Sequence, residues 1–233
     1  MKKVILFALV ASTITVSPLA AIGGIGLQLG QGAFTVASTE DVDETDFITV
    51  TTGEFSNPIS FGGFLYLDLF SDFSLEAELQ LTASEYDFEF TNETDPENVL
   101  SAGPYNGYWG GASTHITVRK EIFGLGIPFL GGGNLFAGGG YNMHTFAPLA
   151  DLSLVESLMG DLNEEPTFSE DDLVDFVNEN KIDKSGFHVQ AGFQFKLLMI
   201  DTFVFYRVSF GEFEDIVGDE SFGSLNIRLG LGI

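Results

Sequence analysis

The chain of 233 residues has no cysteine, few basic residues and no second long apolar run. The absence of cysteine excludes a lipoprotein anchor, a disulfide framework and any cysteine-based metal or catalytic site. Beyond the N-terminus, no segment reaches the ~20 apolar residues that a membrane-spanning helix needs, so any passage through a membrane must be made by strands. Nine lysines and arginines face 34 acidic residues, and the formal charge of −25 repels nucleic acid.

A short basic and apolar segment opens the chain. Two lysines precede an uncharged apolar run from Val4 to Val16, and small residues follow up to Ala21. This order is that of a secretory signal peptide. We therefore expect residues 1–21 to be a leader and residues 22–233 to form one exported domain.

The acidic residues are concentrated rather than spread evenly. Four segments hold 28 of the 34 Asp and Glu residues: residues 38–56, 85–98, 151–184 and 212–220. They predict acidic loops, which attract cations. None of these runs has the spacing of an EF-hand loop, so we expect divalent cations to be held diffusely, without a dedicated metal site.

The clearest structural pattern is a strict alternation of apolar and polar residues. From Phe222 to the chain end, leucine and isoleucine come to occupy every second position, with Ser224, Asn226 and Arg228 on the other face. A period of two predicts a β-strand with one apolar and one polar face. Eight segments are predicted as strands: residues 25–36, 57–70, 73–90, 113–121, 134–146, 186–196, 202–210 and 222–233.

Long and short connections alternate between these strands, an asymmetry typical of outer-membrane barrels. The longest connection, residues 147–185, is predicted to contain two short helices, one with an apolar stripe from Leu152 to Leu162 and one capped by Ser169. Two points stay open. After Ser84 the phase of the alternation changes, which indicates either a β-bulge or a strand that leaves the bilayer. Residues 47–52 are a further strand candidate, so ten strands are the alternative to eight.

The leader and the closing strand together make the chain resemble small bacterial outer-membrane β-barrels of the OmpA/OmpX type. The resemblance lies in the architecture and covers residues 22–233. It implies an all-β fold: an antiparallel up-and-down transmembrane barrel of eight strands, with loops outside the cell and both termini in the periplasm. It also implies contact with outer-membrane lipid and lipopolysaccharide, and insertion by the barrel-assembly machinery. The chain departs from the usual pattern by ending in Ile233 rather than in an aromatic residue.

Charged residues on the polar strand faces favour a membrane barrel over a soluble one of lipocalin type. Water would solvate such charges singly, whereas an enclosed lumen tolerates them only in pairs. The polar faces carry both signs: Asp68, Glu76, Glu78, Arg119, Lys196, Arg207 and Arg228. We expect these residues to form a lumenal network that plugs the barrel, because an eight-stranded interior is just wide enough to be filled by side chains. The alternative is a narrow pore, in which the charged pairs exchange partners.

Nothing in the sequence selects a catalytic site. The three histidines are His115 and His188, on polar strand faces, and His144, near the outer rim. A lone histidine is more often a hydrogen-bonded residue than a base, so we expect a non-enzymatic protein without a cofactor. A rim-located hydrolase or lipid-modifying enzyme built on His144 is the weakest hypothesis.

The expected role is therefore structural or one of surface interaction, with a narrow pore for small solutes as the alternative. Tyr105, Tyr108 and Trp109 end the second long connection and are candidate contact residues for a surface ligand. Aromatic rings near strand ends are also typical of the interfacial girdles of membrane barrels. The sequence identifies no ligand.

Overall fold

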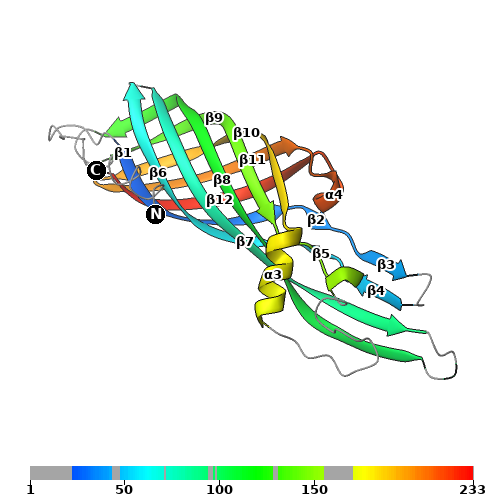
Figure 1. The fold of residues 1–233 in the computed structure, drawn as a ribbon. Helices are drawn as coiled ribbons and strands as arrows, with labels where there is room; N and C mark the ends of the chain where they lie inside the picture. The colour runs from blue at the N-terminus through cyan, green and yellow to red at the C-terminus, as the bar shows by residue number, and fades with distance from the viewer. Residues whose placement is uncertain are drawn as a thin grey trace.

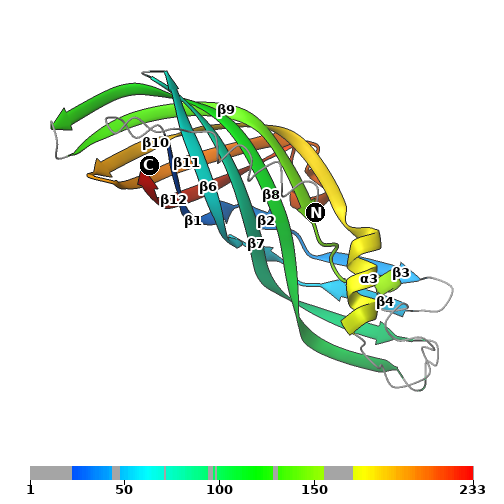
Figure 2. The same ribbon diagram turned by 60° about the vertical axis from the view of Figure 1, so that its left-hand side comes forward.

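The computed structural model describes residues 23–43, 48–70, 72–93, 97, 99–127, 131–154 and 170–232. Eight antiparallel strands form a closed ring (Figure 1, Figure 2): β1 (Gly23–Ala33), β6 (Ile59–Phe70), β7 (Phe73–Asn92), β8 (Leu100–Ile127), β9 (Gly131–Phe146), β10 (Ile182–Leu197), β11 (Ile200–Gly211) and β12 (Ser221–Gly232). The ring closes between β1 and β12, where Gly24 lies opposite Gly232. The predicted eight-stranded up-and-down barrel is confirmed.

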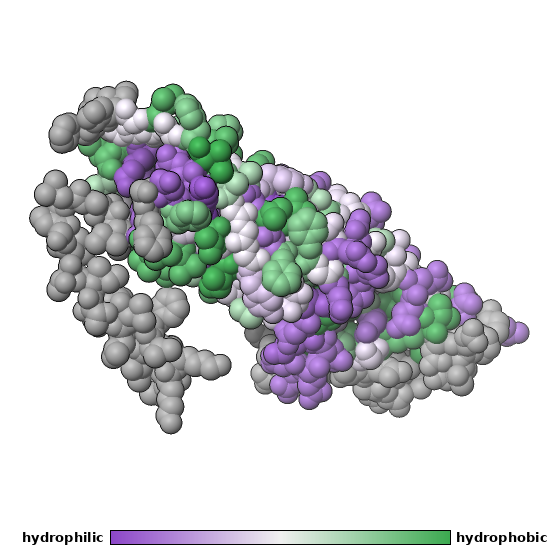
Figure 3. Space-filling view, turned by 90° about the horizontal axis from the view of Figure 1, so that it is seen from above, coloured by the Kyte–Doolittle hydropathy of each residue, from purple (hydrophilic) through white to green (hydrophobic). Residues whose placement is uncertain are grey.

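The barrel is apolar outside and polar inside, the reverse of a soluble protein. On β12, Leu225 and Leu229 are exposed, whereas Asn226 and Arg228 are buried. Figure 3 shows hydrophobic residues bordering a hydrophilic patch in the left-hand part of the molecule, and further hydrophilic residues toward the other end. Water disfavours an apolar belt of this extent, and lipid does not. The chain is therefore a membrane-spanning β-barrel.

At one end the barrel wall continues as a projecting sheet (Figure 1). β7 and β8 stay paired beyond the ring, up to Asn92 opposite Leu100. A hairpin of β3 (Thr39–Asp43) and β4 (Ile48–Thr52) pairs with β7 there, giving the order β3-β4-β7-β8. Among the described residues, neither β3 nor β4 joins the ring itself. The further strand candidate thus exists, but as an extension outside an eight-stranded ring.

The fourth ring strand is much longer than the predicted residues 113–121. β8 runs from Leu100 to Ile127. It stays paired with β7 through the projecting sheet and with β9 at its opposite end. Residues 105–111 are rich in tyrosine and glycine and do not alternate in polarity. The pattern in the sequence therefore could not show this part of the strand.

The polarity of the two faces of β7 changes at Ser84. The pairing of β7 with β8 is unbroken from Phe73 to Phe88, so the same set of residues faces inward throughout. Inward Tyr86 is buried and outward Asp87 is exposed. The inward row changes from polar to aromatic while the outward row changes from apolar to acidic. The unbroken register contradicts a bulge at Ser84, and a strand that leaves the bilayer remains the prediction for this segment.

The connections fall into two groups. Short turns join β6 to β7, β8 to β9 and β10 to β11 at the end where β1 begins and β12 ends. The other end carries the projecting sheet and the long connections, including the small pair of β2 (Thr35–Val36) and β5 (Phe55–Ser56). The predicted asymmetry between the two ends is present.

Three helical segments lie in the described parts of the long connections. α3 (Glu170–Asn180) confirms the second predicted helix, and Leu152–Leu154 are helical where the first was predicted. Residues 155–169, including Ser169, lie outside the described residues, as does the predicted leader. The short helix α4 (Glu214–Val217) was not predicted. In the described part of the chain, no helix is long and apolar enough to cross a membrane.

Candidate functional site in the lumen

Two glutamates of β7 occupy the centre of the barrel interior. Glu76 and Glu78 are two residues apart, so the period of the strand places both on the inner face, where they are buried. Glu78 accepts hydrogen bonds from Nη1 and Nη2 of Arg207, at 2.9 and 2.6 Å. Nη2 of Arg228 contacts the same carboxylate. One side chain thus joins β7 to β11 and β12, on the far side of the ring.

Glu76 also contacts two arginines. Nη1 of Arg228 donates to Oε2 of Glu76 at 3.0 Å. Nε of Arg119 lies 3.0 Å from Oε1, an ion pair whose angle is too bent for a hydrogen bond. Arg228 therefore bridges both carboxylates, and β8 is tied to the same group.

Two glutamines complete this group. The amide of Gln28 donates to Glu78 at 2.6 Å, and its carbonyl accepts from Nε of Arg228 at 2.5 Å. Gln190 donates to Glu76 at 3.1 Å. Six of the eight ring strands meet in what we term the charge cluster: Gln28, Glu76, Glu78, Arg119, Gln190, Arg207 and Arg228.

Two of the seven predicted network residues lie outside the charge cluster. Asp68 accepts a hydrogen bond from Ser74 at 2.6 Å and touches the cluster only through that hydroxyl. Lys196 is partly exposed and lies 4.0 Å from Asp201. Asp201 is fully buried and accepts hydrogen bonds from Tyr66 and Gln194, at 2.5 and 3.0 Å. Asp201 lies one residue before the predicted strand 202–210, although the period of two on β11 extends to it.

Aromatic rings form a base below the charge cluster: Phe64, Tyr66, Phe136, Phe203 and Phe205. The guanidinium of Arg228 lies 4.5 Å from the ring centre of Phe205 and 4.7 Å from that of Phe64. The guanidinium of Arg119 lies 4.9 Å from the ring centre of Phe203. These contacts give the cations a favourable surface where no water is available.

Three histidines form a layer on the other side of the charge cluster. The ring of His115 lies 5.4 Å from that of His144 and 5.2 Å from that of His188. Ser113 is hydrogen-bonded to Nδ1 of His144, at 2.7 Å, and Thr117 to Nε2 of His188, at 2.8 Å. Among the described residues, one ring nitrogen of each histidine has no hydrogen-bond partner, and a cavity of about 30 Å³ adjoins the layer. His144 thus lies inside the barrel rather than at an open rim.

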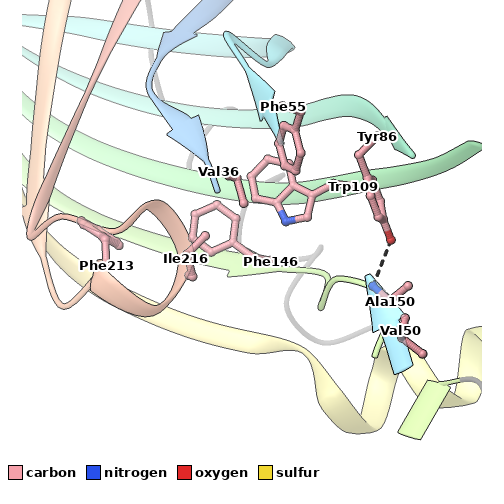
Figure 4. Packing of buried hydrophobic residues seen from close by; sticks show 9 residues of the cluster. All are labelled: Val36, Val50, Phe55, Tyr86, Trp109, Phe146, Ala150, Phe213 and Ile216. Atoms are coloured by element: carbon pink, nitrogen blue, oxygen red, sulfur yellow. Dashed lines mark hydrogen bonds between the residues drawn. The ribbon is translucent and has the colours of Figure 1, made fainter. Parts of the chain in front are cut away.

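On the side of the projecting sheet, the lumen is filled by a buried cluster that we term the aromatic cap (Figure 4): Val36, Val50, Phe55, Tyr86, Trp109, Phe146, Ala150, Phe213 and Ile216. Trp109 is buried in it, with its ring centre 5.3 Å from that of Phe55 and 5.4 Å from that of Phe146. The hydroxyl of Tyr86 accepts a hydrogen bond from the backbone N–H of Ala150 at 3.0 Å. The cap, the charge cluster and the base therefore block the interior at three successive levels.

The three candidate contact residues separate in the structure. Trp109 faces inward and is 2 % exposed, so it offers no surface to a ligand. Its side chain packs inside because β8 extends through this segment and assigns Trp109 to the inner face. Tyr105 and Tyr108 are exposed on the projecting sheet.

The rim beside α4 is acidic, as the sequence predicts for that segment. A depression of about 860 Å³ is lined by carboxylates and one lysine: Lys184, Glu212, Glu214, Asp215, Asp219 and Glu220. Nζ of Lys184 lies 2.7 Å from Asp215. Within the described residues, no group of three or more histidine and acidic side chains is arranged to hold a metal ion.

Comparisons with known proteins found matches among solved structures alone. No protein-family model and no curated protein matches the chain. Among solved structures, Neisserial surface protein A is 10 % identical, covering 92 % of this chain and 98 % of its own, with a TM-score of 0.45. The N-terminal β-barrel domain of OprF from Pseudomonas aeruginosa is 7 % identical, covering 89 % and 96 %, at 0.44. Ail of Yersinia pestis, solved with the heparin analogue sucrose octasulfate, is 12 % identical, covering 90 % and 96 %, at 0.42. Likeness at this level carries no argument about function, which must come from the residues themselves.

Proposed function

We propose that the protein is a closed outer-membrane β-barrel of a diderm bacterium with a structural or surface-interaction role. Its long connections lie outside the cell and its termini in the periplasm. The observation that carries the proposal is the filling of the lumen by the aromatic base, the charge cluster and the aromatic cap. A barrel filled in this way anchors the projecting sheet and the long connections in the membrane and does not transport solutes through its lumen.

The projecting sheet supplies the contact surface. Its outer face presents exposed acidic residues at Glu85, Asp87 and Glu89 of β7, beside the exposed Tyr108 of β8. Such a face attracts a cationic partner and repels lipopolysaccharide phosphates unless divalent cations bridge the two. The apolar belt holds the barrel in outer-membrane lipid, where the barrel-assembly machinery would insert it.

Surface labelling of single-cysteine variants tests the proposed orientation. The natural chain has no cysteine, so each introduced thiol is unique. We expect Tyr108→Cys to react with a membrane-impermeant maleimide on intact cells. Asp72→Cys, in the turn between β6 and β7, is expected to react only after the outer membrane is permeabilised. If only Asp72→Cys reacted on intact cells, the orientation would be the opposite of the one proposed. If neither variant reacted on intact cells, the barrel would not be exposed at the cell surface.

A narrow pore is the second candidate, favoured by the histidine layer and its cavity. Unpartnered polar atoms beside a water-sized space are where a water path would begin if the charge cluster opened. Arg207→Gln separates the two functions: a plug loses stability without conducting, whereas a gate changes conductance. For an enzyme, His144 is poorly placed, because the rings of Phe146, Phe213 and Phe222 enclose it.

A further inference from the structure

Two neighbouring hairpins at the short-turn end carry exposed apolar side chains to their tips. The β8–β9 hairpin exposes Phe123 by 60 % and Leu125 by 70 %. The β10–β11 turn exposes Leu198 by 68 % and Met199 by 64 %. Because β9 and β10 are paired as far as Gly131 and Leu197, the described ends of the two hairpins are adjacent. We term these four residues the apolar lip.

The third short turn at the same end is different. No charged residue occurs in the sequence from 122 to 135 or from 197 to 200, the segments that hold the apolar lip. The connection between β6 and β7 instead has the polar pair Ser71 and Asp72 at its turn, between the exposed Leu69 and Phe73. Polar residues are usual in a turn that meets water. The turn residues themselves are therefore polar between β6 and β7 and apolar between β10 and β11.

The apolar lip continues the lipid-facing belt without a break in polarity on the β10 side. Phe193, Phe195 and Leu197 are all exposed on β10 and lead directly to the lip. On β8 the belt is interrupted by Lys120, whose Nζ lies 5.3 Å from the ring centre of Phe73. A lysine in such a place can keep its ammonium at headgroup level while its stem stays among apolar groups.

The backbone of β8 determines how deep the lip can lie. Beyond Lys120, β8 is no longer paired with β7, and the N–H of Glu121 makes the last contact, to the carbonyl of Asp72 at 2.8 Å. In the described part of the chain, residues 123–127 pair only with β9. An open strand edge is costly in hydrocarbon. The tip therefore fits the headgroup boundary, where its edge stays hydrated and its apolar side chains reach the acyl chains.

We propose that the apolar lip is a membrane-contact surface seated in the interfacial layer of the bilayer. Its occupant is lipid, because the lip is continuous with the wall that already faces lipid. At the short-turn end, the side of the barrel formed by β8–β11 then lies deeper in the bilayer than the side formed by β1, β6 and β7, where Asp72 meets water. The barrel axis is tilted as a result.

Site-directed spin labelling measures this directly. Leu125→Cys and Leu198→Cys are each labelled with a nitroxide and refolded into vesicles of phosphatidylcholine and phosphatidylglycerol. Collision with oxygen, which partitions into lipid, is compared with collision with a water-soluble nickel chelate. Leu229→Cys, on the lipid-facing wall, and Asp72→Cys, at the polar turn, serve as references. A heat-modifiable gel shift shows that each variant is folded, and Phe123→Cys and Met199→Cys replace any that is not.

The expected result is an oxygen-to-nickel collision ratio severalfold higher at both lip positions than at Asp72→Cys, approaching that of Leu229→Cys. Ratios equal to that of Asp72→Cys would overturn the proposal, because the lip would then lie in water. Protection from both reagents would also overturn it, because the lip would then be covered by protein, such as a second copy of the chain.

Discussion

Replacing Glu78 with glutamine tests whether the charge cluster holds the barrel together. The amide keeps the shape of the side chain but removes the negative charge that Arg207 and Arg228 share. The charge cluster then has one carboxylate against three guanidiniums, all buried. Removing one partner of a buried ion pair costs about 3–5 kcal/mol, because the remaining charge has no water to replace it. Since two arginines are affected here, we expect Glu78→Gln to lower the free energy of unfolding by at least about 3 kcal/mol.

The assay is urea unfolding of the barrel refolded in vesicles, followed by the fluorescence of Trp109, the sole tryptophan. Asp215→Asn is the matched control. It removes a carboxylate from the rim pair with Lys184, in which Asp215 is more than half exposed, and it should cost less than about 1 kcal/mol. Glu78→Gln combined with Arg207→Gln restores the original charge difference and should recover part of the loss. If Glu78→Gln alone stays within about 1 kcal/mol of the natural protein, the arginines are solvated and the lumen is not sealed.

Three further changes have defined outcomes. Trp109→Ala empties the centre of the aromatic cap and should cost about 3–5 kcal/mol, measured as a lower temperature of the heat-modifiable gel shift. Gly140→Ala places a methyl group against the carbonyl of Ile116 and should prevent β8–β9 pairing. Gly126→Ala, whose new methyl group has no atom of the described residues within 4 Å apart from its chain neighbours, should fold normally on the same gel. Burial raises the pKa of the Tyr86 phenol above its ordinary value of 10.0. The contribution of the neutral phenol to stability is therefore complete below about pH 10 and is lost as the pH rises through the pKa of the folded state. A urea titration across this range should show that fall in the natural protein and a smaller one in Tyr86→Phe.

The barrel could be predicted because its signal is local and repeated. Alternation along β12 and β7 assigned the correct residues to each face, and these faces placed Glu76, Glu78 and Arg228 inside together. An inward row of polar residues flanked by leucine leaves little choice of register, since a slip by one residue would expose the whole row to lipid. The ring and the centre of its lumen therefore follow from the sequence.

The rest depends on contacts between distant strands. The local sequence does not predict that Trp109 faces inward, because its neighbours are tyrosine and glycine. The pairing of β8 with β7 determines on which face it lies. The burial of Asp201 depends in the same way on Tyr66, which is 135 residues away in the chain. The gathering of His115, His144 and His188 needs three strands in register. Residues of this kind become visible only once the ring is closed.

Single-channel conductance of the natural protein in a planar bilayer tests the central claim, a lumen closed by its own side chains, most directly. The barrel is refolded, shown to be folded by its heat-modifiable gel shift, and recorded in potassium chloride at several concentrations. A lumen blocked by the aromatic base, the charge cluster and the aromatic cap predicts insertion without conductance steps. Discrete steps whose size rises with salt concentration would contradict it and would make Glu76, Glu78 and their arginines the lining of a pore.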